Sequence, residues 1–220
     1  MSSQSTIAAR VGSFHEHAAA NLPAEALAVF AKEQAEQSAR SADTAAWIGR
    51  EMPDGDLLDE EGKPTSLSSA RADRAAVVVF YRGAWCPYCN ITLRAYQESL
   101  APQLDAAGVA LIAISPQRPE KLAEARETNQ LSFTVLSDPG NQLAGALGLL
   151  TETGAAARAV QAGLGIDVAA SNADGTHAIP MPTVIVLDGS GVIRWIDAHA
   201  DYTTRTEAAE ILEQVGRLAG

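Results

Sequence analysis

The feature that most constrains this chain is the segment Trp-Cys-Pro-Tyr-Cys at residues 85–89, which contains both of the cysteines found in 220 residues. It directly follows an apolar run at residues 77–81, where a buried strand would give way to a helix. Two thiols three positions apart at a helix start can form a disulfide with little backbone movement, and thiolate is favoured there. Cys86 and Cys89 therefore predict a redox-active dithiol.

Composition narrows the class of protein and of partner. The chain has 16 basic and 27 acidic residues, a formal net charge of −11, which argues against nucleic acid or an anionic membrane surface as a partner. Hydrophobic residues make up 47% of the chain, as expected for a globular fold. The first ten residues have no apolar signal-peptide core, and no run approaches the about 18 apolar residues of a membrane span. We expect a cytoplasmic protein.

Strand and helix patterns alternate from residue 75 onward, so parallel strands with helical crossovers are expected, followed by an antiparallel hairpin and a closing helix. The expected strands are residues 75–81, 109–114, 133–136, 183–187 and 192–196. The expected helices are residues 86–107, broken at Pro102, then 119–129, 138–147 with Asp138-Pro139 as its start, and a last helix opened by a capping box from Thr204 to Glu207.

Two regions lie outside this alternation. Residues 1–50 are Ala-rich and helical in pattern, with a thin apolar stripe that includes Leu22 and Phe30. This N-terminal arm is expected to pack on the main domain or, in a homodimer, on a second subunit; a frayed, solvated helix is the alternative. Residues 51–220 are expected to form one domain, with an insertion over one sheet edge at about 150–180 that carries a short helix near 155–162.

The order of elements, with the dithiol after the first core strand, resembles the thioredoxin fold. Within that fold, roughly residues 50–220 resemble the peroxiredoxin-like branch, the alkyl hydroperoxide reductase / thiol-specific antioxidant family. The matching segments are residues 80–89 (FYRGAWCPYC), 113–117 (AISPQ), 136–139 (LSDP) and 179–183 (IPMPT) with the hairpin that follows. The resemblance implies an α/β fold with a central mixed sheet flanked by helices.

The residues around the thiols suit thiolate chemistry. Unpaired N–H groups and the dipole at a helix N-terminus stabilise a thiolate anion. Arg82 adds positive potential, Pro87 has no N–H to lose in the first turn, and Trp85 can wall off water. The residues expected to shape the site are Arg82, Trp85, Pro87, Tyr88, Met181 and Pro182.

Which thiol attacks first is left open by two patterns. In thioredoxin-like proteins the first cysteine of C-x-x-C is the exposed nucleophile, and this is Cys86. The peroxiredoxin pattern P-x-x-x-T-x-x-C falls on Arg82, Cys86 and Cys89, which puts Cys89 in the peroxidatic place and Cys86 where threonine is usual. Cys86 is the expected nucleophile toward disulfides, and both thiols are candidates toward peroxides.

The remaining features depart from either parent family or have ordinary explanations. Met181-Pro182 resembles the cis-proline loop of thioredoxin-like proteins, with a free Met181 backbone, but the arginine expected nearby in peroxiredoxins is absent. Arg82 is one replacement for that cation. His199 is a proton-shuttle candidate or a solvated hairpin-end residue, and Arg205 recurs in this branch but equally suits a surface ion pair.

These features predict a thiol-dependent antioxidant oxidoreductase. Hydroperoxide oxidises one of Cys86 and Cys89, the other resolves it, and an external thioredoxin-like or glutathione-like reductant regenerates the pair. One alternative is a thioredoxin- or glutaredoxin-like disulfide reductase, since Cys-Pro-Tyr-Cys also resembles the glutaredoxin site. Another is a non-catalytic redox sensor or metal-delivery protein. We expect no bound cofactor and no metal.

Overall fold

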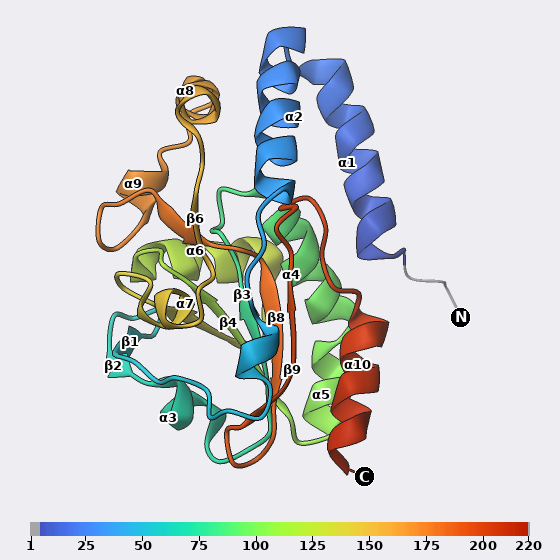
Figure 1. Cartoon of the computed structure of the whole chain (residues 1–220), viewed down its shortest axis with the longest axis vertical. Coiled ribbons are helices and arrows are strands. Elements are labelled where there is room, and N and C mark those ends of the chain that lie inside the picture. The colour runs from blue at the N-terminus through green and yellow to red at the C-terminus, as the bar shows by residue number, and fades with distance from the viewer. Residues whose placement is uncertain (1–4, 220) are drawn as a thin grey trace.

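The middle of the sheet is built from continuous apolar runs, because both of its faces are covered. The computed structural model describes residues 5–219 and shows a seven-stranded mixed sheet with helices on both sides (Figure 1). Its central strands β3 (Ala76–Phe80), β4 (Ala110–Ser115) and β8 (Thr183–Leu187) are buried along their whole length. Such runs are typical of strands packed on both faces.

The strand order is β2-β1-β5-β4-β3-β8-β9. Strands β3, β4 and β5 are parallel. Strand β8 runs antiparallel to β9, as the hairpin pattern predicted, and also antiparallel to β3. The outer strands are β1 (Leu57–Leu58), β2 (Pro64–Thr65), β5 (Thr134–Ser137) and β9 (Ile193–Ala198). The expected central mixed sheet is therefore present.

Alternate residues of the central strand feed two separate cores. Val77 and Val79 join the core that holds both cysteines, against helices α4 and α10. Val78 and Phe80 point the other way, into the core beneath α3 and α7. These helices are α3 (Leu67–Arg71), α4 (Pro87–Ser99), α7 (Gln142–Ala146) and α10 (Ala208–Gly216).

The helix expected over residues 86–107 is split near Pro102. Helix α4 ends at Ser99, and α5 (Ala101–Ala106) begins with the proline in its first turn, where the missing N–H costs nothing. Helix α6 (Pro119–Asn129) has the bounds that the sequence predicted.

Two predicted helix starts are wrong. Helix α7 begins at Gln142 rather than at Pro139, and the Asp138 carboxylate instead accepts hydrogen bonds from the backbone N–H of Gln142 at 2.7 Å and of Leu143 at 3.0 Å. The carboxylate thus caps the helix from one turn ahead.

The capping box expected at the last helix is also absent. Helix α10 begins at Ala208, and the Glu207 carboxylate accepts hydrogen bonds from the backbone N–H of Ile7 at 3.0 Å and of Ala8 at 2.9 Å. Glu207 therefore caps the first helix of the chain, because tertiary packing brings that helix N-terminus to its side chain.

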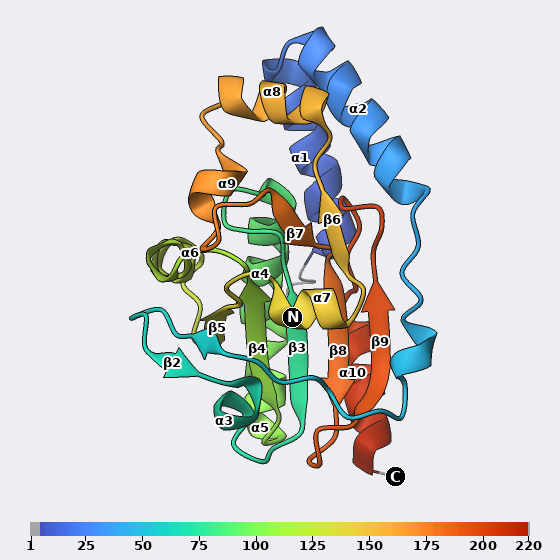
Figure 2. The ribbon, with the colours of Figure 1, turned by 60° about the vertical axis from the view of Figure 1, so that its left-hand side comes forward.

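The first fifty residues contain helices α1 (Ile7–Asn21) and α2 (Ala24–Ser38) and a short 3₁₀ turn, η1 (Ala45–Trp47). Helix α1 buries Ile7 and Val11 in the core that contains the cysteines. Helix α2 lies beside α8 (Ala155–Gly163) at the top of Figure 2. The division at residue 50 stays a prediction, as does a homodimer, and residues 1–4 and 220 lie outside the described residues.

Residues 150–180 form a small unit at the end of the sheet where the dithiol lies (Figure 2). Strands β6 (Leu150–Glu152) and β7 (Ala178–Pro180) pair antiparallel around α8 and α9 (Val168–Ser171), and α8 corresponds to the helix expected near residues 155–162. Within residues 5–219, no helix has the length and apolar character needed to cross a membrane.

Candidate active site

The dithiol lies where β3 passes into α4. Cys86 is the N-cap of α4, Pro87 follows at the first helical position, and Cys89 is in the first turn. The preceding loop is held by its backbone at Ala84, whose N–H donates to Gln117 Oε1 at 2.6 Å and whose carbonyl accepts from Asn90 Nδ2 at 2.7 Å. Both cysteines are reduced and buried, Cys86 with 1% and Cys89 with 0% of its surface exposed. Neither is an exposed nucleophile.

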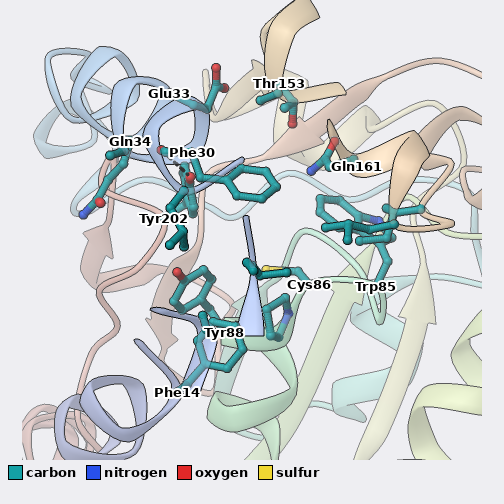
Figure 3. Close-up of a pocket in the computed structure, with 18 of the residues that line it drawn as sticks. Phe14, Phe30, Glu33, Gln34, Trp85, Cys86, Tyr88, Thr153, Gln161 and Tyr202 are labelled. Carbon is teal, nitrogen blue, oxygen red and sulfur yellow. Dashed lines mark hydrogen bonds between the residues drawn. The ribbon is translucent and has the colours of Figure 1, made fainter. Parts of the chain in front are cut away.

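The loop needs glycine at position 83. Gly83 has φ of +150°, and a Cβ there would collide with the indole ring of Trp85. The absence of a side chain lets Trp85 fold back over the loop, where its ring forms one wall beside Cys86 (Figure 3).

Cys89 is surrounded by hydrogen-bond donors. Arg205 Nη2 donates to Cys89 Sγ at 3.3 Å, and Arg205 Nη1 is fixed by the carbonyls of Tyr202 and Thr204, each at 2.6 Å. Burial alone raises the pKa of the Cys89 thiol, but the hydrogen bond from Cys86, the charges of Arg205 and Arg82 and the Arg82 backbone N–H together lower that pKa well below its usual value. Cys89 is therefore the more acidic thiol of the pair.

Cys86 has the opposite character. Burial raises the pKa of the Cys86 thiol, and the hydrogen bond to Cys89 and the charge on Cys89 raise it further, against the smaller opposing effect of Arg82. Cys86 is thus the less acidic thiol of the pair, in the place where the peroxiredoxin pattern has a threonine hydroxyl.

Arg82 is enclosed by aromatic rings. Its guanidinium carbon lies 5.1 Å from the ring centroid of Trp85 and 4.3 Å from that of Tyr202, and Nη2 donates to Thr153 Oγ1 at 3.2 Å. Only 5% of Arg82 is exposed. Stacking of this kind holds a cation in a dry site, so the positive charge remains close to both sulfurs.

The two sulfurs border different spaces. Cys86 lines a cavity of about 380 Å³, the outer chamber, whose walls come from α1, α2, α8 and the loop before α4 (Figure 3). Cys89 instead lines a cavity of about 10 Å³, the inner cavity. The inner cavity is bordered by Tyr81, Tyr96, Pro182, His199 and Arg205.

The other predicted site residues are placed as follows. Pro87 and Tyr88 line the outer chamber. Tyr88 OH lies 3.0 Å from His15 Nε2, and the Tyr88 ring meets those of Phe14 and Tyr202 edge-on, with centroids 5.3 Å and 5.9 Å away. The N-terminal arm therefore completes one side of the site.

The predictions made for the Met181-Pro182 loop are partly wrong. No peptide bond among the described residues is cis, so this one is trans. The backbone N–H of Met181 donates to Leu149 O at 2.8 Å, and the Met181 carbonyl accepts from Thr183 Oγ1 at 2.9 Å. The backbone of Met181 is therefore occupied within the chain, whereas Pro182 borders the inner cavity.

Two residues lie closer to the thiols than the sequence indicated. Arg205 supplies the cation that is missing near Met181; its place three residues after Tyr202 in a recurring segment was the available signal. His199 borders the inner cavity rather than solvent alone, with Nε2 3.0 Å from Asp197 Oδ2 and Nδ1 2.7 Å from Thr204 Oγ1. Within the described part of the chain, no three His, Cys, Asp or Glu side chains form a group that could hold a metal.

Comparison with known proteins gives the family. The family described as AhpC/TSA matches residues 48–196, and the chain belongs to it. Putative peroxiredoxin bcp of Haemophilus influenzae is 35% identical over 105 residues, 48% of this chain and 66% of that protein. Peroxiredoxin Bcp of Escherichia coli is 32% identical over 100 residues, 46% of this chain and 63% of that protein. The matches thus span just under two thirds of these relatives.

Solved structures support the thioredoxin-like fold. Peroxidoxin BcpB from Mycobacterium tuberculosis has a TM-score of 0.58 at 20% identity, over 78% of this chain and 96% of that one. A peroxiredoxin-like protein from Aquifex aeolicus has a TM-score of 0.60 at 17% identity, over 78% and 86%.

Proposed function

We propose that this protein is a thiol-dependent peroxidase in which Cys89 attacks the hydroperoxide and Cys86 resolves the product. The observation that carries the proposal is the contact of Arg205 Nη2 with the fully buried Cys89 Sγ at 3.3 Å. A cation held at that distance stabilises the thiolate, which is the reactive form of cysteine. Membership of the AhpC/TSA family supports the same chemistry.

The reaction follows from the two pKa shifts. The Cys89 thiolate attacks one peroxide oxygen; an S–O bond forms, the O–O bond breaks, and the leaving hydroxide or alkoxide takes up a proton from solvent. Cys86 then loses its proton and attacks Cys89 Sγ, so that an S–S bond forms and the oxygen leaves as water. The peroxide gains the two electrons that the two thiols lose.

The inner cavity favours a small oxidant. Its volume of about 10 Å³ is close to the space that one water molecule needs. Hydrogen peroxide has two heavy atoms and requires only slight adjustment there, whereas a bulky organic hydroperoxide requires more. Hydrogen peroxide is therefore the substrate to test first, with an external thiol as the reductant.

The alternative of a protein disulfide reductase has less support. A protein disulfide must bring its sulfur to an accessible thiol, and Cys86 is 1% exposed. Backbone pairing with a substrate at Met181 would require the N–H that already binds Leu149. The cytoplasmic location stays a prediction.

The test compares Cys86→Ser with Cys89→Ser. Under hydrogen peroxide, Cys86→Ser should form a sulfenic acid that a dimedone probe traps, with no intramolecular disulfide. Cys89→Ser should form neither product at a rate above that of a free thiol, because the remaining thiol is protonated. Sulfenic acid on Cys86 alone would contradict the assignment, and oxidation of the wild type without turnover in the presence of thiol would indicate a sensor.

A further inference from the structure

The outer chamber has no role in the oxidation steps proposed above, yet it ends at Cys86. We infer that it receives the reductant, a low-molecular-weight thiol with an apolar body that attacks Cys86 in the oxidised protein. This inference rests on the proposed function and adds the direction from which electrons return. Oxidant and reductant then reach the dithiol from different sides.

The chemistry of the disulfide favours attack at Cys86. In thiol–disulfide exchange the sulfur with the lower pKa is the better leaving group, and Cys89 has the lower pKa of the pair. The incoming thiolate RS⁻ forms a bond to Cys86 Sγ while the S–S bond breaks and Cys89 leaves as the thiolate that Arg205 stabilises. A second RSH, or the second thiol of a dithiol, releases Cys86 and leaves as the disulfide, so two electrons enter the protein.

The lining of the chamber indicates an apolar body for this thiol. The apolar side chains that border it are Phe14, Leu22, Leu27, Phe30, Leu164 and Ile166. Its volume of about 380 Å³ lies within the range of small-molecule sites. Glu33 also borders the chamber, but its carboxylate accepts hydrogen bonds from the N–H of Gly154 at 3.1 Å and from Gln37 Nε2 at 2.9 Å. That acid is thus paired within the protein.

The walls of the chamber argue against a protein thiol. Helices α1 and α2 and the insertion helix α8 surround the approach to Cys86 (Figures 2 and 3). Helix α2 is tied to the core domain by Tyr202 OH, which donates to Phe30 O at 3.3 Å, and by Gln34 Nε2, which donates to Asp201 Oδ2 at 3.0 Å. A sulfur on a protein surface would have to displace these helices, whereas a small thiol would not.

The experiment measures only the reductive half of the cycle. The Cys86–Cys89 disulfide is made with diamide, so the measurement does not require peroxidase activity. Its reduction is then followed with two thiols of similar acidity, benzyl mercaptan and 2-mercaptoethanol. We expect benzyl mercaptan to react about tenfold faster or more, because its ring leaves water for an apolar site.

A pair of variants on α2 locates the effect. Ala31 lines the chamber and is exposed, whereas Ala28 is also exposed and does not line it. Ala31→Trp should bring the rate ratio of the two thiols close to one, and Ala28→Trp should keep the wild-type ratio. Equal rates for the two thiols in the wild type would overturn the inference. The same rate ratio in Ala31→Trp and in Ala28→Trp would also overturn it.

The last measurement uses a protein thiol as the reductant. Thioredoxin that reduces the same disulfide faster than benzyl mercaptan at equal concentration would also overturn the inference. Failure of hydrogen peroxide to form sulfenic acid in Cys86→Ser would contradict the proposed peroxidase instead, and it would leave the comparison of thiols unaffected.

Discussion

The inner cavity and the outer chamber differ in nearly every physical property, although the sulfurs that border them are three residues apart. The inner cavity holds about 10 Å³ and has Arg205 against Cys89, whereas the outer chamber holds about 380 Å³ and is walled mostly by apolar side chains. The difference shows that two thiols of one short motif can lie in very different surroundings, which is the basis for the separate roles that we propose.

The two spaces also come from different parts of the chain. The inner cavity is bordered by strand ends and loops of the thioredoxin-like sheet, including Pro182 and Arg205. The outer chamber depends on α1, α2 and α8, which lie in the arm and the insertion. In our interpretation, the shared fold supplies the reactive sulfur and the added segments control what reaches its neighbour.

The largest expected effect is the difference between Cys89 and a free cysteine in how the rate of oxidation depends on pH. Because the pKa of Cys89 is lowered, the rate with hydrogen peroxide should stay constant as pH falls through the ordinary cysteine range and decline only below the Cys89 pKa. A free cysteine, with a pKa of about 8.5, loses about tenfold per unit, or several hundredfold by about pH 6. Stopped-flow traces of reduced protein across this range test the prediction, and a decline that begins near pH 8 would contradict it.

Removal of the Arg205 cation should slow the reaction of Cys89 in the inner cavity. Arg205→Leu takes away a charged donor from Cys89, which is worth about 1.5–3 kcal/mol, so the pKa of Cys89 should rise by about one to two units and the rate at neutral pH should fall. The rate should recover at higher pH as the Cys89 thiol ionises. Arg205→Lys should restore part of the loss, since it keeps the charge without the fixed geometry.

The matched control for this variant is Arg194→Leu. Arg194 is an exposed arginine of the β8–β9 hairpin that pairs with Asp188 at 2.7 Å, away from both cavities. Its loss should leave the rate with hydrogen peroxide unchanged. If Arg205→Leu and Arg194→Leu behaved alike, the assignment of Cys89 as an arginine-stabilised thiolate would fail.

Loss of the link between arm and insertion should weaken the outer chamber. Glu33→Ala leaves the Gly154 N–H without its acceptor and removes one of the two acceptors of the Gln37 amide, at a cost of about 1–3 kcal/mol in the free energy of unfolding. Urea denaturation measures the change. Glu36→Ala, on the same helix and exposed, loses only a 3.8 Å pair with Lys32 and should change stability by less than about 0.5 kcal/mol. If Glu33→Ala and Glu36→Ala changed the free energy of unfolding equally, Glu33 would not link the arm to the insertion.

The smallest effect is expected for Tyr88, which lines the outer chamber and contacts His15 of the arm. Tyr88→Phe removes the contact with His15 Nε2 but keeps the ring packing against Phe14 and Tyr202, so stability should fall by about 1 kcal/mol or less. Burial raises the pKa of Tyr88 to about 12, so its hydroxyl keeps its proton throughout the range used for the rate measurements. Thermal unfolding at two pH values checks this, and a loss above about 2 kcal/mol would contradict it.

Much of the fold could be predicted because it depends on local patterns. Apolar runs at residues 77–81 and 183–187, the hairpin turn between β8 and β9, and the break at Pro102 each carry their signal within a few residues. Helix starts were less predictable where a side chain caps from a distance. The Glu207 carboxylate finds its partners through tertiary packing and reaches a helix 199 residues earlier in the chain, whereas the Asp138 carboxylate caps a helix that begins only four residues later.

In the site, too, the local features could be predicted and those that depend on distant residues could not. That Cys86 and Cys89 would meet at a helix start was readable from their spacing and from Pro87. Which of them is acidic was not, because the answer depends on Arg205, which lies 116 residues away from Cys89. The occupied backbone of Met181 was not readable either, because its N–H donates to Leu149, which lies 32 positions earlier in the chain.

The order of amino acids was enough to establish a dithiol of the AhpC/TSA type on a thioredoxin-like sheet, because spacing, turn residues and apolar periodicity act over short stretches of chain. The difference in surroundings between the two sulfurs, on which the proposed roles rest, came only with the packed molecule. Ionisation and access depend on charges and walls within a few ångströms, and those are contributed by helices and loops that are distant along the chain.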